Sequence, residues 1–378
     1  MTTRNRKSIT FKAMKNPVAE SLVSWYSVNK RHLPWRETRD PYLIWLSEVI
    51  LQQTRVNQGL EYYRRFVEAF PTVFDLSGAA ETEVLKLWQG LGYYSRARNL
   101  HKTAKIIVEN QSGKFPETSS GLLKLPGIGN YTAAAIASIC FDEAAPVVDG
   151  NVIRVVSRLF GIAENAQTPG GYKQIAHIMH ELMEGFAPSL FNQAVMEFGA
   201  LQCVPNSPAC HQCSLQPQCF AFANGLVQQL PVKKSKPEVT VRYFNYLVIT
   251  ITKADGDCIL LRKRTGKDIW HNLYDFPAVE NSRELITDQD LTSSDAGNLL
   301  PTDFSILGIS GRYTHLLTHR RIIAKFFRIH ISSEMAPMQN HYWVKVADLP
   351  GYPVPRLIDR YLHEHPVSTL VIQHRMKQ

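Results

Sequence analysis

The chain has 378 residues, of which 44% are hydrophobic and 20% charged, and its formal net charge is +9. This composition is that of a globular protein with room for two domains, and it excludes a wholly disordered chain. No apolar run approaches the roughly 18 residues that a membrane span needs, so no membrane partner is expected. The positive charge favours a polyanionic partner, nucleic acid first, although a protein that is basic only for solubility carries the same charge.

The N-terminus, residues 1–16, is basic and contains no acidic residue. It lacks the apolar core of a secretory signal and is expected to be a disordered arm. A weak similarity to a mitochondrial transit peptide leaves the compartment open. We expect a cytoplasmic, nucleoid-associated location in a bacterium, with the mitochondrion and the nucleus as alternatives.

Residues 17–225 show the apolar spacing of helices, interrupted by short Gly, Pro and Ser breaks. The clearest run spans Pro41–Phe70 and ends at Pro71, and β-branched alternation is scarce. A mostly α-helical first domain is therefore predicted. Residues 226–240 contain two prolines and three lysines without a helical period, which is typical of a linker.

Residues 241–378 have a different pattern. Two apolar runs flank the sequence KADGD at 253–257, which predicts a β-hairpin. A late helix is predicted near residues 355–365. Strands are predicted over residues 243–251, 258–264, 322–331 and 341–346. The second domain is thus expected to be of the α+β class.

Four of the six cysteines, Cys203, Cys210, Cys213 and Cys219, lie within 17 residues in the spacing C-x6-C-x2-C-x5-C. Without a secretory signal the thiols should be reduced. Zinc sites usually pair two short C-x2–4-C knuckles, and only one is present here. Four thiolates on one short loop favour an iron–sulfur cluster, with zinc as the alternative.

The stretch LKLPGIGNYTAAAI joins two short helices through Gly127 and Gly129. Glycines before a helix let backbone amides approach an anion, such as a DNA phosphate, without reading base sequence. The alternative is a simple helical turn with a glycine C-cap.

Two carboxylates are candidates for acid–base chemistry. Glu48 interrupts an apolar helix face between Ile44 and Leu51, where loss of solvation would raise its pKa and make it a proton donor. The alternative is a glutamate at the edge of that face that reaches solvent. Asp149 precedes an amphipathic helix and is either a helix cap or an ionised partner to the proton donor.

In combination these motifs resemble the helix–hairpin–helix DNA glycosylases with a [4Fe–4S] cluster, a superfamily that includes endonuclease III and the adenine DNA glycosylases. Within it, the sequences LPWR, SEVILQQTRV, GLGYYSRARNL and VDGNV match the MutY-type adenine glycosylases. The resemblance covers nearly the whole chain. It implies a [4Fe–4S] cofactor on the four cysteines and, as substrate, duplex DNA with adenine opposite 8-oxoguanine or guanine. A monomer is expected.

The same resemblance assigns roles around the scissile bond. Glu48 would protonate adenine at N7, and Asp149, oriented by Asn151, would stabilise the cationic sugar. Relatives that also cut the strand carry a lysine where this chain has Tyr131. Tyrosine has no amine for a Schiff base, so a monofunctional glycosylase is predicted.

Further positions carry over for base extrusion and recognition. Gln53, Leu91 and Tyr93 match residues that wedge into the duplex or fill the gap. Leu91 and Tyr93 would otherwise be core residues of a turn. Arg36 and Glu197 match residues of the adenine pocket, together with Tyr131.

The second domain resembles a Nudix module. Thr287 and Asp288 stand where the hydrolase signature requires two glutamates, so nucleotide hydrolysis is not expected. The sequence YTHLLTH resembles the family's H-x-F-S-H loop, which implies 8-oxoguanine recognition. Leu317 replaces the family phenylalanine and loses its stacking, which puts the strength of lesion discrimination in doubt. The implied recognition residues are His315, Leu317, Thr318 and His319.

Two other functions compete with adenine excision. One is a glycosylase–lyase for thymine or oxidised pyrimidines, which Tyr131 and the long second domain disfavour. The other is a catalytically silent protein that binds DNA lesions, which the presence of both Glu48 and Asp149 disfavours.

Overall fold

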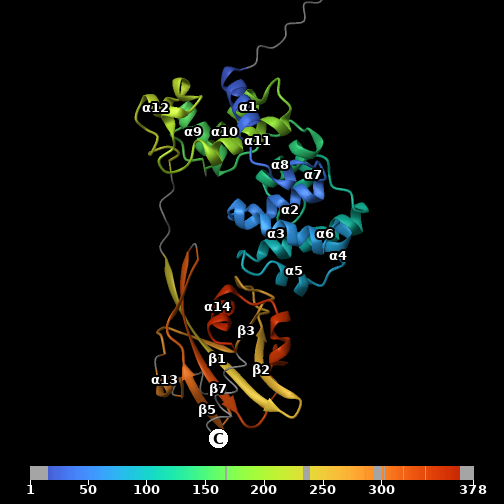
Figure 1. Ribbon diagram of the computed structural model, residues 1–378, viewed down its shortest axis with the longest axis vertical. Coiled ribbons are helices and arrows are strands. Elements are labelled where there is room, and N and C mark those ends of the chain that lie inside the picture. Colours follow the sequence, from blue (N-terminus) through green and yellow to red (C-terminus); the bar gives the residue numbers. More distant parts are fainter. Residues whose placement is uncertain are drawn as a thin grey trace, which may run out of the picture. The chain divides into compact units, whose positions relative to one another are not determined.

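The computed structural model describes residues 16–166, 168–232, 239–285, 287–292, 300–301, 303–317, 319–336 and 338–366. Most of the expected N-terminal arm, part of the expected linker, and Thr318 lie outside these residues. The chain forms two compact units (Figure 1). The helical unit comprises the described residues of Met1–Val67, Thr72–Phe74 and Thr103–Ser235, and the sheet unit comprises those of Glu68–Pro71, Asp75–Lys102 and Lys236–Gln378.

The first part of the chain is helical, as the sequence predicts, and α3, α4 and α6 cross from one unit to the other. Prolines begin several helices, and residues such as Asp40 and Thr168 cap them with a side-chain oxygen. The elements are α1 (Pro17–Asn29), η1 (Pro34–Arg36), α2 (Pro41–Leu51), α3 (Val56–Ala69), α4 (Val73–Gly78), α5 (Glu81–Leu87), α6 (Ser95–Gln111), α7 (Ser119–Leu122), α8 (Asn130–Phe141), α9 (Gly150–Phe160), α10 (Pro169–Met183), α11 (Pro188–Leu201), η2 (Cys210–Gln212), η3 (Gln216–Gln218) and α12 (Phe220–Ala223).

One hydrophobic core of the helical unit lies where α1, α9, α10 and α11 meet. Val152, Val156 and Leu159 form the apolar stripe of the predicted amphipathic helix, α9, and they are buried together with Val155. Cys203, Cys213 and Cys219 pack against this core. The helix that Asp149 caps, α9, and the cysteine-rich loop are therefore supported by the same set of side chains.

The sheet unit contains an eight-stranded mixed sheet among the described residues, with the central order β3-β2-β1-β7-β5. β4 also pairs with β1, β6 with β7, and β8 with β2. The predicted hairpin is present, with Lys253 opposite Gly256. The elements are β1 (Thr240–Lys253), β2 (Gly256–Lys263), β3 (Tyr274–Asp275), β4 (Ala278–Asn281), α13 (Asp288–Thr292), β5 (Phe304–Ile309), β6 (Tyr313–Leu316), β7 (Arg320–Ile331), β8 (His341–Lys345), η5 (Val346–Gly351) and α14 (Arg356–Glu364).

Residues 244–251 of the central strand β1 are all buried. Since alternate residues of a strand point to opposite sides, both faces of β1 are covered. Leu247 and Ile249 contribute to one apolar cluster. On the other face, Tyr246 stacks on Phe326, and Phe326 stacks on Tyr361 of α14 with ring centroids 3.9 Å apart. This aromatic layer fixes α14 against the sheet.

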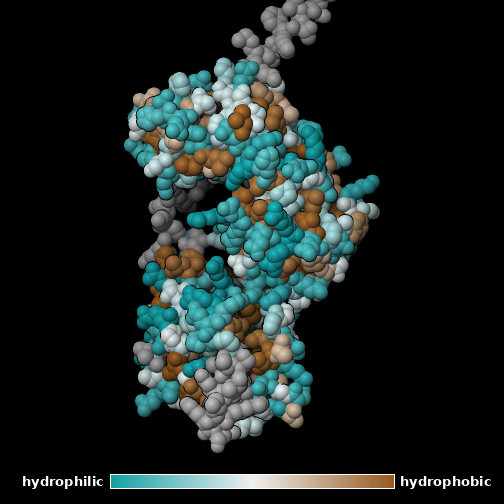
Figure 2. Space-filling model, viewed as in Figure 1, coloured by the Kyte–Doolittle hydropathy of each residue, from teal (hydrophilic) through white to brown (hydrophobic). Residues whose placement is uncertain are grey.

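None of the described helices combines the length and apolar character required to span a membrane. On the face drawn in Figure 2, the hydrophobic side chains are scattered among hydrophilic ones.

Candidate active site

Glu48 lies on α2 (Pro41–Leu51), which is buried along nearly its whole length. Its side chain is only 7% exposed, so the alternative of a glutamate that reaches solvent is wrong. The Tyr131 hydroxyl, at the start of α8 (Asn130–Phe141), donates a hydrogen bond to Glu48 Oε2. The small residues of α8, such as Ala133 and Ala135, are fully buried and let it pack closely against α2.

Asp149 caps α9, since its Oδ1 accepts a hydrogen bond from Val152 N–H at 2.7 Å. Its other oxygen accepts one from Asn151 Nδ2, also at 2.7 Å. The two readings of Asp149 from the sequence, cap and functional carboxylate, are therefore compatible. Asn151 lies beside Asp149, as the sequence comparison with the glycosylases implied.

These groups line one cavity of about 220 Å³ in the helical unit. A concave site with a few convergent polar groups is the usual form of a small-ligand or base-binding pocket. The cavity brings together residues from η1, α2, α8, α9 and α11 that are distant in the chain. The sequence-predicted residues that line it are Arg36, Glu48, Tyr131, Asp149, Asn151 and Glu197.

Burial raises the pKa of Glu48 to about 7, although the Tyr131 hydrogen bond acts in the opposite direction. The nearby charge of Asp149 raises it further. Burial also raises the pKa of Asp149, but the hydrogen bonds from Val152 and Asn151 oppose that shift. The site thus holds one carboxyl whose pKa lies near neutrality, so that it can carry a proton there, beside a second carboxyl whose pKa burial also raises and whose anion is favoured by two hydrogen bonds.

Glu197 on α11 is 1% exposed and is held by two arginines. Arg36 donates to both of its oxygens, at 2.8 and 2.7 Å, and Arg31 does so at 2.9 and 2.6 Å. Burial acts to raise the pKa of Glu197, but these hydrogen bonds outweigh it and lower the pKa to about 2. Arg31 was not predicted, because a lone arginine in a helical sequence has the appearance of a surface residue.

Two further residues of the site were missed. A Cβ on Gly199 of α11 would lie 2.7 Å from Asn151 Cβ and 2.9 Å from Asn151 O, so only glycine allows α11 to pack on the start of α9. Arg154 donates to Asn151 Oδ1 at 2.8 Å and to Gly199 O at 2.6 Å. Both residues therefore hold Asn151, and through it Asp149. No local motif signals the contacts of Gly199, because they join two separate helices, whereas Arg154 lies three residues after Asn151 on the same helix.

The predicted hairpin is present between α7 and α8. Gly127 has φ +77°, a backbone conformation that favours glycine, and Thr103 Oγ1 donates to Pro126 O at 2.8 Å. Gly129 is the N-cap of α8, and a Cβ there would meet open space. The backbone N–H groups at this helix start can donate hydrogen bonds to an anion.

The four clustered cysteines line a second cavity, together with apolar side chains such as Val155 and Phe198. All are free thiols. Arg158, a buried residue of α9, donates to Cys203 Sγ at 3.3 Å and to the carbonyls of Val204, Pro205 and Leu230 at 2.8–3.1 Å. The four cysteines border one cavity, and the Arg158 guanidinium beside Cys203 is a donor that would suit a metal-bound thiolate, although no set of three or more His, Cys, Asp or Glu side chains among the described residues is arranged to hold a metal ion.

The predicted wedge residues differ in exposure. Tyr93 is 49% exposed, and Gln53 is also exposed, with positive φ angles of 48° and 58°. Leu91 is 8% exposed and packs into the core. Its burial agrees with the alternative interpretation, in which Leu91 is a core residue of the turn. Their roles on DNA stay predictions.

The predicted lesion-recognition residues lie at the β6–β7 hairpin. His315 points inward, with its ring centroid 5.9 Å from that of Trp270, and burial lowers its pKa. Leu317 closes the hairpin by donating its N–H to Arg320 O at 2.8 Å, and His319 is exposed. Thr318 lies outside the described residues.

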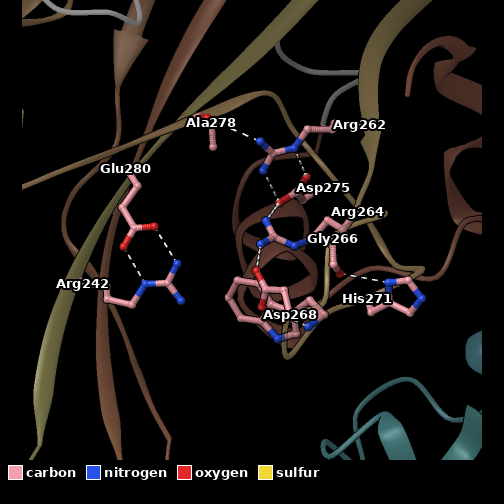
Figure 3. A network of polar contacts seen from close by, with 10 residues as sticks. Arg242, Arg262, Arg264, Gly266, Asp268, His271, Asp275, Ala278 and Glu280 are labelled. Atoms are coloured by element: carbon pink, nitrogen blue, oxygen red, sulfur yellow. Dashed lines mark hydrogen bonds and ion pairs between the residues drawn. The ribbon is translucent and has the colours of Figure 1, made fainter. Parts of the chain in front are cut away.

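A buried ion-pair network supports the loop that carries Trp270. Arg262 and Arg264 converge on Asp275, which is fully buried, and Arg264 also pairs with Asp268 (Figure 3). His271 Nδ1 and Gly266 O lie 2.9 Å apart at the turn of this loop. The loop is therefore anchored on the sheet through the fully buried carboxylate of Asp275, while the other charged side chains of the network are partly exposed.

Comparison with known proteins agrees with this geometry. Residues 46–185 match the HhH-GPD superfamily of base excision DNA repair proteins, and residues 247–364 match the NUDIX domain. A thermostable thymine-DNA glycosylase of known structure is similar, with a TM-score of 0.51 and 28% identity, covering 55% of this chain and 95% of that one. The helical fold, the two carboxylates in one cavity and these matches define a helix–hairpin–helix base excision DNA glycosylase joined to a Nudix-like domain.

Relatives with a stated activity narrow the class of protein. The chain is 37% identical over 267 residues to the adenine DNA glycosylase of Buchnera aphidicola subsp. Schizaphis graminum, covering 68% of this chain and 74% of that protein. It is 34% identical over 305 residues to the adenine DNA glycosylase of Buchnera aphidicola subsp. Baizongia pistaciae, and this match covers 79% of this chain and 82% of that protein. The human adenine DNA glycosylase is 44% identical over 210 residues, which span 38% of its length. The chain belongs to the adenine DNA glycosylase family, and the predicted family and fold class are confirmed.

Proposed function

We propose that this protein excises adenine paired with 8-oxoguanine or guanine in duplex DNA, and that it leaves an abasic site without cutting the strand. The observation that carries the proposal is the pair of unlike carboxyls in one cavity: Glu48 with a pKa raised to about 7 beside Asp149. The protein acts as a monomer on its DNA.

In this mechanism Glu48 donates its proton to N7 of the extruded adenine. The C1′–N9 bond then breaks, its electron pair leaves with the protonated base, and the base departs neutral. The ionised Asp149 stabilises the positive charge that develops on the sugar. A water molecule adds to C1′ and returns a proton to the Glu48 carboxylate, which completes the cycle.

Tyr131 keeps the reaction monofunctional. The Tyr131 hydroxyl donates a hydrogen bond to Glu48, and the tyrosine side chain has no amine that could attack C1′. The paired side chains of Arg36 and Glu197 form a rigid wall of the same cavity, where they can distinguish the edge of an adenine from other bases.

The four cysteines would hold a [4Fe–4S] cluster as thiolates. The proposal is supported by the four cysteines that line one cavity and by the Arg158 donor beside Cys203. When bound, the cluster supplies a rigid cross-link for a loop that contains only short 3-10 turns. The chemistry at the sugar needs only Glu48 and Asp149.

The sheet unit would read the base opposite the adenine through the hairpin of His315, Leu317, Thr318 and His319. A hydroxyl at position 318 can accept a hydrogen bond from the N7–H of 8-oxoguanine, a group that guanine lacks. The backbone of Gly127–Gly129 would hold a phosphate of the strand that carries the adenine.

The test is single-turnover incubation with an end-labelled duplex that contains one adenine opposite 8-oxoguanine, analysed before and after hot alkali. Breakage at the adenine only after alkali is the expected result, and a duplex with adenine opposite thymine is the control. Breakage before alkali would overturn the monofunctional assignment. Tight binding without any product would favour the silent lesion-binding protein.

A further inference from the structure

The turn between α5 (Glu81–Leu87) and α6 (Ser95–Gln111) carries two of the candidate wedge residues. Its backbone is unusual, since Gly90, Gly92 and Tyr93 all have positive φ angles, of 101°, 72° and 48°. For tyrosine this conformation is strained, and such strain persists only where the surroundings enforce it. Something must therefore hold the turn.

Part of the restraint comes from the helices that flank the turn. Trp88 Nε1 donates to Gly92 O at 3.0 Å, and Arg96 donates to Gly92 O at 3.2 Å. The Arg96 guanidinium lies 4.9 Å from the Trp88 ring centroid and 5.7 Å from that of Tyr93. These contacts fix the turn on α5 and α6.

Further restraint comes from a residue far along the chain, Val354, which lies between η5 and α14 and is 2% exposed. Its N–H donates to Gln89 Oε1 at 3.1 Å, and its carbonyl accepts from the Tyr94 hydroxyl at 3.2 Å. Gln89 and Tyr94 are the residues that immediately precede and follow the turn. Both ends of the turn are thus fastened to one peptide segment of the Nudix-like part.

Gln89 uses both ends of its amide. Its Nε2 donates to Asp359 Oδ1 of α14 at 2.7 Å, a hydrogen bond to a charged acceptor. Lys86, one helical turn earlier, donates to Gln89 Oε1 at 3.2 Å and to Tyr352 O at 3.3 Å. The amide orientation is therefore determined by partners on both sides.

Two more contacts join the same parts of the sheet unit. Asn272 Nδ2 donates to Glu81 Oε1 at 2.6 Å, and Arg98 donates to His271 O at 2.9 Å. Both partners belong to the loop that carries Trp270, which packs against His315. One loop thus contacts the candidate lesion-reading histidine and also the helices around the wedge turn.

We propose that the Nudix-like part holds the Gly90–Tyr93 turn in its strained conformation through Val354 and Asp359, and that Gln89 is a positioning residue for base extrusion. This proposal rests on the proposed function. It gives the second domain a role in excision that acts through the protein backbone, in addition to any contact with the opposite base.

The test exchanges the donor and the acceptor of the hydrogen bond between Gln89 and Asp359. Gln89→Glu places two carboxylates at the position of the 2.7 Å contact with Asp359, whereas Gln89→Glu with Asp359→Asn restores a donor and an acceptor at the wild-type net charge. Tyr94→Phe removes only the hydroxyl that binds Val354. Tyr342→Phe, on the exposed face of β8, is the matched control.

Two quantities are measured on each full-length variant: amide hydrogen exchange of peptides covering residues 89–96, and the single-turnover rate of adenine excision at saturating enzyme. We expect Gln89→Glu to speed exchange locally and to slow excision about tenfold, the effect of one lost hydrogen bond to a charged group. Tyr94→Phe should act in the same direction, and the double variant should recover both quantities. Tyr342→Phe should change neither.

The outcomes separate this proposal from the proposed function. If the wild-type protein excises no adenine, the proposed function fails, while the exchange data still decide whether Val354 and Asp359 hold the turn. Unchanged exchange in both Gln89→Glu and Tyr94→Phe overturns the proposal. So does faster exchange with an unchanged excision rate, because the turn would then not limit extrusion. Thermal unfolding of each variant identifies any that fails to fold, and Tyr94→Phe serves as the test if Gln89→Glu does.

Discussion

Replacing Glu48 by glutamine should make the protein more stable above neutral pH while it removes catalysis. Burial raises the Glu48 pKa from 4.5 to about 7. The folded state therefore binds more protons than the unfolded state between these two values, and stability falls as pH rises through that window. For a carboxyl that is 7% exposed, the full loss above pH 7 corresponds to about 3 kcal/mol.

Glutamine does not titrate, so the unfolding free energy of the Glu48→Gln variant does not fall in this pH range. We expect the free energies of unfolding of wild type and Glu48→Gln to agree near pH 4 and to diverge by up to about 3 kcal/mol near pH 8. Excision should fall by at least about 100-fold, because the amide cannot act as a general acid. Urea unfolding at several pH values, together with the single-turnover assay, measures both effects.

The control is Glu61→Gln on α3, an exposed position whose stability profile should follow that of the wild type. If Glu48→Gln and the wild type lose stability in parallel as pH rises, then Glu48 does not keep its proton in the folded state. The acid-catalysis assignment would fail with it, even if the variant were inactive.

Three further predictions concern the same unit. Glu197→Gln leaves two arginines without their buried counter-charge and should lower the free energy of unfolding by about 3 kcal/mol. The control Asp142→Asn, in an exposed ion pair, should lower it by less than about 1 kcal/mol, and urea unfolding measures both values. Tyr131→Phe removes a hydrogen bond that lowers the Glu48 pKa, so the alkaline limb of the pH–rate profile should move to higher pH. An alkaline limb that stays in place or moves to lower pH would contradict the assignment of Glu48 as the proton donor. Cys213→Ser should reduce bound iron and thermal stability together, as measured by iron content and calorimetry, and full iron retention would exclude this thiol as a ligand.

The amino-acid sequence by itself determined the elements and the family. Helical apolar spacing predicted the first part of the chain, and the KADGD turn predicted the β1–β2 hairpin, because both depend on interactions between residues close in the chain. Asp149 could be located as a helix N-cap for the same reason. The cysteine spacing singled out its loop, since four thiols so close together rarely lack a common ligand.

Only the tertiary structure decided what surrounds these residues. Periodicity showed that Glu48 lies on an apolar helix but not that α2 is buried on all sides, and the burial raises its pKa. Periodicity could not bring Glu48 and Asp149 to one cavity, or Arg31 to Glu197, because the members of each pair come from segments that are far apart in the chain.

The same limit applies to Gln89 and Val354. Their contact uses a backbone N–H and a side-chain amide, and almost every residue offers the former. No pattern of residue types can therefore signal that the chain near residue 90 packs with the Nudix-like part. Local interactions specify the elements, and the non-local packing of those elements specifies the site.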